Sequence, residues 1–546
     1  MPPSVSFADT PASPRAGIPL RKKFNSKAGR RSARPASIDP LSDRATQALI
    51  RRTLCPQRSA DKGRDSQMPI DKLLPPLTSR NDVNLQLYAF LAIILREFVQ
   101  SWYSKVTTDE TFVGEILHII AHCTQTLEER FRKLDLESLA LNEIPELLEK
   151  HVTSKLTVVS SVQPPLELDS REAYHALWPL PFLSPVPQPG DSLKAAEQRE
   201  NEAIYRQLLV QAVLAVILPT AELENPCLTA LVGQIFSELI LGNAVGTKAV
   251  QPWLLYEGIC ILARLRDEKK VTSKQESTPV TGQTNLKIST RGRWSARGIF
   301  PAIVHLIFVF LSSIRLMAAT IAMSTSLPPR TTPSEEIEDP NGPASTTADH
   351  VTATQSKVPV LASRAWTFLA NLIELSSRMP WLAACFSLLQ LGAVNGPGRI
   401  AASDSKLDRF LSHHIRSLFS PTLLPPTLRT LRGVLFPNNS LGSSSMQPPS
   451  SDAELRALRR RAARALSDLL PGGVARVYFC GRLTVRPGAS GEDNEQIVDQ
   501  VEQLLMVLDD EYCNKHLMYS VLELVLVRLM PELSDKGVIE LWEERA

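Results

Sequence analysis

The sequence lacks the cysteine spacing that disulfide frameworks and zinc sites require. Its seven cysteines are scattered, and no two stand in a CxxC arrangement. Reduced thiols in the cytosol fit this usage best. The N-terminus also has prolines and serines where a signal peptide needs an apolar segment. We therefore expect a protein that is neither secreted nor stabilised by disulfides.

A large net charge and catalytic motifs are absent as well. The formal net charge is +3 over 546 residues, so the chain as a whole is neither a polyanion binder nor an acidic protein. There is no GxSxG, P-loop, kinase motif or helix-opening GxGxxG. Aromatic and basic residues are not interleaved as in single-strand binders. We expect no enzyme, no cofactor and no nucleic-acid partner.

One spacing could in principle hold a metal ion. In HIIAH, His118 and His122 stand four residues apart on an expected helix. Zinc proteases place a glutamate between two such histidines, and none is present here. No acidic third ligand follows at an obvious distance. We expect core or boundary histidines and no metal site.

Apolar periodicity divides the chain into two helical regions joined by polar linkers. Helix, short loop and helix alternate in both regions, without a convincing strand or an internal repeat, so the fold class predicted is all-α. The expected segments are a disordered basic tail over 1–80, a helical domain over 82–268, a linker over 269–297, an apolar helix over 298–323, a disordered linker over 324–359 and a second helical domain over 360–546.

Two local patterns have ordinary structural interpretations. The stretch GNAVG, residues 242–246, follows an apolar helix and fits a C-cap and turn. The stretch RALRRRAAR, residues 456–464, puts arginines on several faces of one helix. That distribution favours a solvated face over a contact with lipid or with an acidic partner.

Basic residues concentrate in the N-terminal tail, which has fourteen Lys and Arg against five Asp and Glu over residues 1–67. A solvated tail is the simplest interpretation. The alternative is that the tail binds anionic lipid, with a contribution of about 1 kcal/mol from each basic residue near the surface. The candidate membrane contacts in the tail are Arg21, Lys22, Lys23, Arg30 and Arg31.

Residues 298–323 form the most apolar segment of the chain. Residues 298–314 carry no Lys, Arg, Asp or Glu, and Arg315 then interrupts the run. A bilayer span needs about 20 apolar residues, and an arginine in its middle is costly. The pattern favours a buried or membrane-surface helix over a true span. The candidate membrane contacts here are Val304, Phe308 and Leu311.

The stretch LDDEYCNKHLMYSVLELVLVRLMPEL, residues 508–533, predicts a helix that is apolar on more than one side. Asp509 and Asp510 suit its N-cap, and Pro531 ends it because proline lacks the backbone donor. Its apolar stripe is wider than that of a surface helix. Other helices or lipid must therefore cover it.

The helical domain over 82–268 resembles the PXA (PX-associated) domain. The resemblance rests on LREFVQSWYSKV at 95–106, on VLAVILP at 213–219 and on the turn at Asn225 and Pro226. The first motif corresponds to the basic, acidic and aromatic pattern of the family. Its residues here are Arg96, Glu97, Phe98, Val99, Trp102 and Tyr103.

The region over 365–535 resembles the sorting-nexin C-terminal domain, nexin-C. The first matching stretch is LRTLRGVLFPNNSLG at 428–442, and the second is NKHLMYSVLELVLVRLMPEL. The residues that carry the first match are Arg432, Leu435, Phe436, Pro437 and Asn438. No PX or RGS domain fits between the two regions. The chain therefore resembles a short fungal-type relative, for which neither phosphoinositide reading by a PX domain nor a G-protein role is implied.

The resemblance implies that the two regions pack into one helical body with an apolar tunnel for acyl chains. From the residues alone, simple core packing without a tunnel is the competing interpretation. The candidate tunnel lining is Leu214, Ile217, Ile235, Leu239, Val521, Leu522, Val525 and Leu529.

The function that the resemblance implies is a lipid-binding adaptor in organelle contact or endosomal–vacuolar trafficking. Its partners would be membrane lipids, through acyl chains and anionic headgroups, and trafficking proteins. It would lie on the cytoplasmic face of the endoplasmic reticulum or of endosomes and vacuoles. The alternative is a protein-interaction scaffold in vesicle traffic without lipid cargo.

Overall fold

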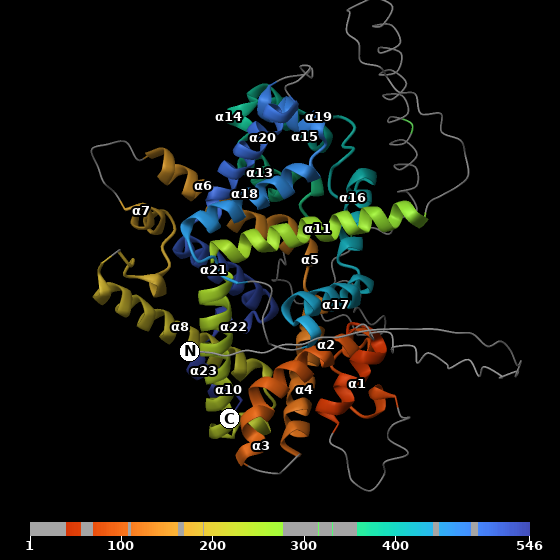
Figure 1. Cartoon of the computed structure of the whole chain (residues 1–546), viewed down its shortest axis with the longest axis vertical. Coiled ribbons are helices and arrows are strands. Elements are labelled where there is room, and N and C mark those ends of the chain that lie inside the picture. Colours follow the sequence, from red (N-terminus) through yellow and green to blue (C-terminus); the bar gives the residue numbers. More distant parts are fainter. Residues whose placement is uncertain are drawn as a thin grey trace, which may run out of the picture.

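A computed structural model shows an assembly of helices, and its described part contains no strand (Figure 1). The all-α prediction is confirmed. The structure describes residues 40–55, 69–106, 111–161, 169–188, 190–276, 315, 330, 357–439, 447–481 and 490–545.

The first half of the described chain ends in the long helix α11, which crosses the middle of the molecule (Figure 1). Side-chain caps fix where several helices begin; at α10, the carboxamide of Asn225 accepts from the backbone N–H groups of Cys227 and Leu228. The elements are α1 (Asp43–Leu54), η1 (Ile70–Lys72), α2 (Asn81–Ile94), η2 (Leu95–Gln100), α3 (Ser101–Val106), α4 (Thr111–Lys133), α5 (Leu136–Ser138), η3 (Leu139–Glu143), α6 (Ile144–Ser161), α7 (Ser170–Leu177), η4 (Pro181–Leu183), α8 (Ser192–Ile217), α9 (Thr220–Leu223), α10 (Pro226–Gln234), η5 (Ile235–Ala249) and α11 (Pro252–Glu276).

The second half packs directly on the first. Helix α18 lies along α11, α13 along α6, and α17 along α2. The elements are η8 (Val360–Ala362), α13 (Arg364–Leu372), α14 (Leu375–Arg378), α15 (Pro380–Asn395), α16 (Lys406–Leu418), η9 (Pro421–Leu423), α17 (Leu424–Leu435), η10 (Pro437–Asn439), α18 (Asp452–Leu469), α19 (Gly472–Cys480), α20 (Ser490–Leu505), η11 (Met506–Leu508), α21 (Glu511–Leu529), α22 (Glu532–Asp535) and α23 (Val538–Glu543).

Part of the segment expected to be disordered is folded. Helix α1 buries Leu49, Ile50 and Leu54 against α2 and α4, in the same core cluster as Ile70 of η1. The expectation of a disordered tail over 1–80 is therefore wrong for residues 40–55 and 69–80. Three apolar side chains in a strongly basic stretch are a weak sequence signal for a helix. They stabilise α1 because they pack against α2 and α4.

One further boundary moves, and one expected helix start is confirmed. Helix α11 continues to Glu276, so the first eight residues of the linker expected from residue 269 are helical. Helix α21 begins after the cap Asp510, whose carboxylate accepts from the N–H of Cys513 at 3.0 Å. Its buried residues lie in its first half, from Tyr512 to Ser520. The apolar second half is only partly covered.

Candidate functional site

A charged network is buried where α8, η5 and α21 meet. Glu202 of α8 is 3% exposed and forms ion pairs with Arg206 (3.0 Å between Nη1 and Oε1) and with Lys515 of α21 (3.1 Å). The hydroxyl of Tyr519 donates to the same carboxylate at 2.7 Å. Burial is the first cause that raises the pKa of Tyr519, so its hydroxyl stays protonated and keeps donating.

Two glycines of η5 allow this network to form. A Cβ on Gly246 would lie 2.8 Å from the hydroxyl oxygen of Tyr519 and 2.9 Å from a carboxylate oxygen of Glu202. A Cβ on Gly242 would lie 3.2 Å from the guanidinium of Arg206. The stretch GNAVG therefore lies inside a continuing helix and is not a C-cap and turn. Its glycines allow η5 to pack closely against α8 and α21, and they do not form a left-handed turn.

The opposite side of the same segment is apolar and faces outward. Helices α10 and η5 are continuous in sequence, and their large apolar residues recur every four or five positions along one side. We call this set the outer apolar face: Leu231 (45% exposed), Ile235 (39%), Phe236 (46%), Leu239 (40%) and Ile240 (38%). The inner side of the segment packs its glycines and Leu241 against neighbouring helices, so this helix carries apolar residues on its outer side as well.

The length and composition of the α10–η5 segment agree with an exposed apolar side. In the described part of the chain, Pro226–Ala249 is the one helical stretch of 24 residues that is long and apolar enough to cross a membrane. Only 6% of its most apolar window is buried inside the molecule. A core helix of a soluble protein would be mostly buried.

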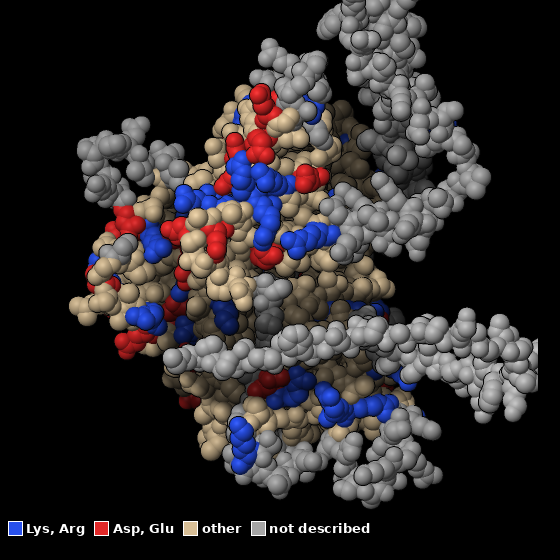
Figure 2. Space-filling model, in the orientation of Figure 1, with Lys and Arg blue, Asp and Glu red and all other residues tan. Residues whose placement is uncertain are grey.

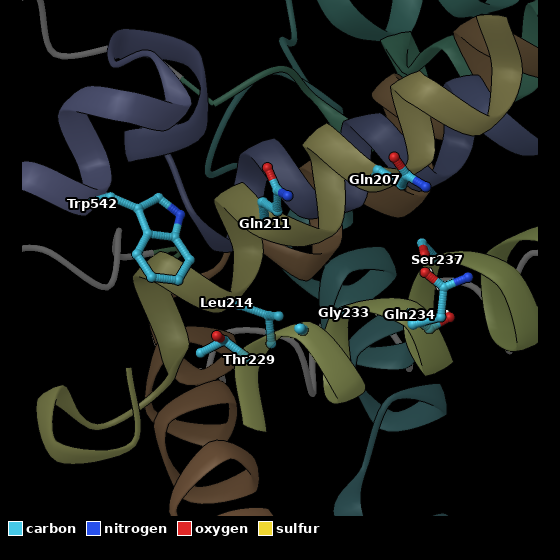
Figure 3. A pocket seen from close by; sticks show the side chains of 9 residues that line it. Gln207, Gln211, Leu214, Thr229, Gly233, Gln234, Ser237 and Trp542 are labelled. Carbon is cyan, nitrogen blue, oxygen red and sulfur yellow. Dashed lines mark hydrogen bonds between the residues drawn. The ribbon is translucent and has the colours of Figure 1, made fainter. Parts of the chain in front are cut away.

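A groove of roughly 340 Å³ runs beside this segment, between α8, α10, η5 and α23 (Figure 3). Gln207 and Gln211 line it from α8, facing Gln234 and Ser237 across the gap, and Trp542 closes one end. Leu214 is the one candidate tunnel residue in this lining. The lining mixes three uncharged amides with apolar side chains and carries no charge, so neutral groups suit it better than ions.

The candidate tunnel residues separate into two groups. Leu214 packs with Leu522 in one buried cluster, and Ile217 packs with Leu529 in the next. Val521 contacts a third cluster, and Val525 is half-buried. Ile235 and Leu239 instead belong to the outer apolar face. The first group joins α8 to α21, and a tunnel through these positions stays a prediction.

The candidate membrane contacts of the tail and of the apolar segment lie outside the described residues. These are Arg21, Lys22, Lys23, Arg30, Arg31, Val304, Phe308 and Leu311.

Buried histidines join α6, α7 and α21. Nδ1 of His175 lies 3.2 Å from Nε2 of His516 and 3.0 Å from the hydroxyl of Tyr512. Nδ1 of His151 lies 2.9 Å from the hydroxyl of Tyr174. Burial lowers the pKa of His516 to about 3 and that of His151 to about 4. Both rings are therefore neutral at pH 7 and act as packing and hydrogen-bonding groups.

The basic run of α18 is paired within the protein. Arg459 contacts Glu502 at 3.1 Å and also Asp509, and Arg460 contacts Asp499 at 2.9 Å. Figure 2 shows basic and acidic side chains mixed over this region. The prediction of a mainly solvated face is wrong for Arg459, whose side chain is 16% exposed. Acidic residues of α20, together with Asp509 before α21, supply these partners, and they are distant in sequence.

The histidines of the HIIAH stretch are both exposed on α4. Within the ranges that the structure describes, no group of three or more His, Cys, Asp or Glu side chains is placed to hold a metal ion.

Comparison with known proteins assigns the N-terminal helical region. Residues 80–262 match the model of the PXA domain family, a range that runs from α2 into α11. The chain contains a PXA domain. The outer apolar face and the buried carboxylate of Glu202 both lie within this PXA domain.

One curated relative is PXA domain protein 1 of Schizosaccharomyces pombe, which is 31% identical over 137 residues. The similarity covers 24% of this chain and 25% of the relative. No solved structure matches the chain.

Sequence reasoning missed the outer apolar face. The apolar run over 226–249 was visible, but apolar residues are normally assigned to the interior. The signal that could have revealed it is the neighbouring helix α8, whose central residues RENEAIYR carry charges that need partners.

Proposed function

We propose that this PXA-domain protein is a non-enzymatic adaptor that contacts membrane lipid and acts in organelle contact or endosomal–vacuolar trafficking. The trafficking role rests on the PXA domain and on the resemblance of the C-terminal region to nexin-C. The proposed location is the cytoplasmic face of the endoplasmic reticulum or of endosomes and vacuoles. Lipid and trafficking proteins are the proposed partners.

The observation that carries the lipid contact is the outer apolar face. Fully burying one large aliphatic or aromatic side chain stabilises by about 1.5–3 kcal/mol. Each of the five side chains is already more than half covered, so lipid would add about 1 kcal/mol each and about 5 kcal/mol together. That is comparable with a single acyl anchor, which binds membranes reversibly.

A second membrane signal is therefore required for stable attachment. The basic tail supplies a candidate, because each basic residue near an anionic surface adds about 1 kcal/mol. In this proposal, acyl chains contact the outside of the protein. Leu214 and Ile217 then serve the core between α8 and α21, where they pack.

Vesicle flotation tests this proposal with the full chain. The double variant Phe236→Glu with Leu239→Glu puts two charges on the outer apolar face, and we expect vesicle binding to fall at least tenfold. The matched control is Leu262→Glu on α11, which is 69% exposed and lies outside that face. Equal binding of both variants and of wild type would overturn the proposal, provided that all three give the same helical circular dichroism spectrum.

A further inference from the structure

Helix α15 is the most exposed apolar element of the described chain. It has no buried residue, and residues 380–398 contain no Lys, Arg, Asp or Glu. Its large side chains are exposed on several sides: Trp381 (68%), Phe386 (57%), Leu388 (69%), Leu389 (63%) and Leu391 (57%). A helix that is apolar around its circumference belongs in a protein core or in lipid.

The contacts of α15 hold its position without covering it. The side chain of Gln390 donates to the carbonyl of Leu361 in η8, and the carbonyl of Ala393 accepts from the N–H of Ala401 at 2.9 Å. Helix α14 adjoins its N-terminal end. These are polar or end contacts, so the apolar side chains stay unpartnered.

The exposed basic residues that follow α15 suit an anionic surface. Arg378 precedes the helix, but its ion pair with Glu374 at 2.9 Å leaves it 19% exposed, so it adds no free charge at that end. Arg399 and Lys406 follow the helix and are exposed. Trp381 stands one residue inside the N-terminal end, where an amphipathic ring sits at headgroup level. Exposed basic residues beyond one end of an uncharged helix fit anionic headgroups beside acyl chains.

The length of α15 limits how it can enter a bilayer. Sixteen residues at about 1.5 Å each give a helix of about 24 Å, which is shorter than the hydrocarbon core of about 30 Å. A helix of this length, fixed to a folded body at both ends, lies in the interface between headgroups and acyl chains.

Another apolar stretch of the same chain could reach this surface. Arg330 is fixed by Glu137 (2.5 Å) and Asp408, and its N–H donates to Asp404 at 3.0 Å, close in sequence to Ala401. Residue 323 lies seven positions before this anchor, which is at most about 25 Å of chain. That segment carries Arg315 and no acidic residue, so it does not complement the charges of Arg399 and Lys406, whereas anionic lipid does.

We propose that α15 is a lipid-inserting helix that lodges at the interface of an anionic bilayer. This surface is separate from the outer apolar face, because α15 and α10 lie at opposite ends of the long axis (Figure 1). The inference therefore goes beyond the proposed function and can fail independently of it.

Two exposed cysteines make the test selective. Cys385 lies on α15, and Cys227 lies on α10, four residues before Leu231 of the outer apolar face; the other cysteines are buried or half-buried. The full chain carrying Cys227→Ser is labelled with a polarity-sensitive NBD fluorophore at Cys385. The Cys385→Ser protein is labelled at Cys227. Each is mixed with vesicles of phosphatidylcholine and phosphatidylserine, with and without doxyl-labelled acyl chains.

The expected result is a shift of the Cys385 emission to shorter wavelength on vesicle addition, with quenching by doxyl chains. A response at Cys227 without one at Cys385 would overturn the α15 proposal and leave the proposed function standing. A short-wavelength emission before vesicles are added would also overturn it. If that emission depended on protein concentration, the occupant would be a second copy; if it did not, the occupant would be a segment of the same chain.

A charge variant gives an independent measurement. Leu388→Glu with Leu389→Glu should reduce flotation with these vesicles at least tenfold. The control Ile539→Glu on α23, at a residue that is 75% exposed, should leave flotation unchanged. Unchanged flotation of the α15 variant would contradict the proposal.

Discussion

Replacing Gly246 with alanine should destabilise the protein, although alanine is the better helix former. The new Cβ would lie 2.8 Å from the hydroxyl oxygen of Tyr519 and 2.9 Å from Glu202, closer than such contacts occur. Either η5 moves away from α21 or the hydrogen bond between Tyr519 and Glu202 breaks. Gly258 of α11 is the matched control, because its Cβ would meet nothing within 4 Å.

Whether alanine stabilises or destabilises the protein depends on the size of two opposing effects. Helix propensity favours alanine by about 1 kcal/mol at both positions. At position 246, overpacking costs about 1–3 kcal/mol, and loss of a buried hydrogen bond to a charged group costs about 1.5–3 kcal/mol. We therefore expect Gly246→Ala to lower the free energy of unfolding by about 2 kcal/mol, and Gly258→Ala to raise it by up to about 1 kcal/mol.

Urea denaturation followed by circular dichroism measures both variants. A double-mutant cycle tests the same contact, because Tyr519→Phe removes the hydroxyl that the new alanine side chain would meet. In that background Gly246→Ala should cost less than in the wild type. If Gly246→Ala were as neutral or stabilising as Gly258→Ala, the close approach of η5 and α21 would be refuted.

Three further predictions concern the core. Because burial lowers the pKa of His516 and His151 below the ordinary value near 6.5, the unfolded state binds protons first as pH falls. The free energy of unfolding is therefore highest above pH 6.5 and falls as the pH is lowered towards 4, by at most roughly 2 kcal/mol per histidine at pH 5. Equal urea midpoints at pH 7 and pH 5 would contradict this prediction. Phe436→Ala removes a ring 5.8 Å from that of Phe90 and should cost about 2 kcal/mol, with Leu435→Ala, at a 44% exposed side chain, as the milder control in the same assay. Arg330→Ala leaves the buried Asp408 without its cation and should cost about 3–5 kcal/mol, read as a fall in melting temperature; an unchanged Tm would show that the anchor is dispensable.

The sequence predicted the helices well, because their apolar periodicity and caps are local properties. Asp510, for example, stands at the predicted start of α21 and caps it. Helix α1 was missed because its apolar residues are few and its stability depends on α2 and α4. Local composition cannot show which distant surface will receive a short helix.

The orientation of the α10–η5 segment could not be predicted for a different reason. Sequence gives the apolar side of a helix but not whether that side faces the core. Here the inner side is fixed by Glu202 of α8 and by Lys515 and Tyr519 of α21, which are more than 300 residues apart in the chain. Only the packed structure shows that the side of the segment that carries the glycines faces the buried charged network.

The most direct test of the central claim is photo-crosslinking from the outer apolar face in cells. Phe236 is replaced by p-benzoylphenylalanine, the protein is irradiated and isolated, and the adducts are identified by mass spectrometry, with the same replacement at Leu262 as control. The account predicts adducts with phospholipid acyl chains at position 236 and none at position 262. Adducts with a protein at position 236, without lipid adducts, would contradict it and would favour a scaffold in vesicle traffic.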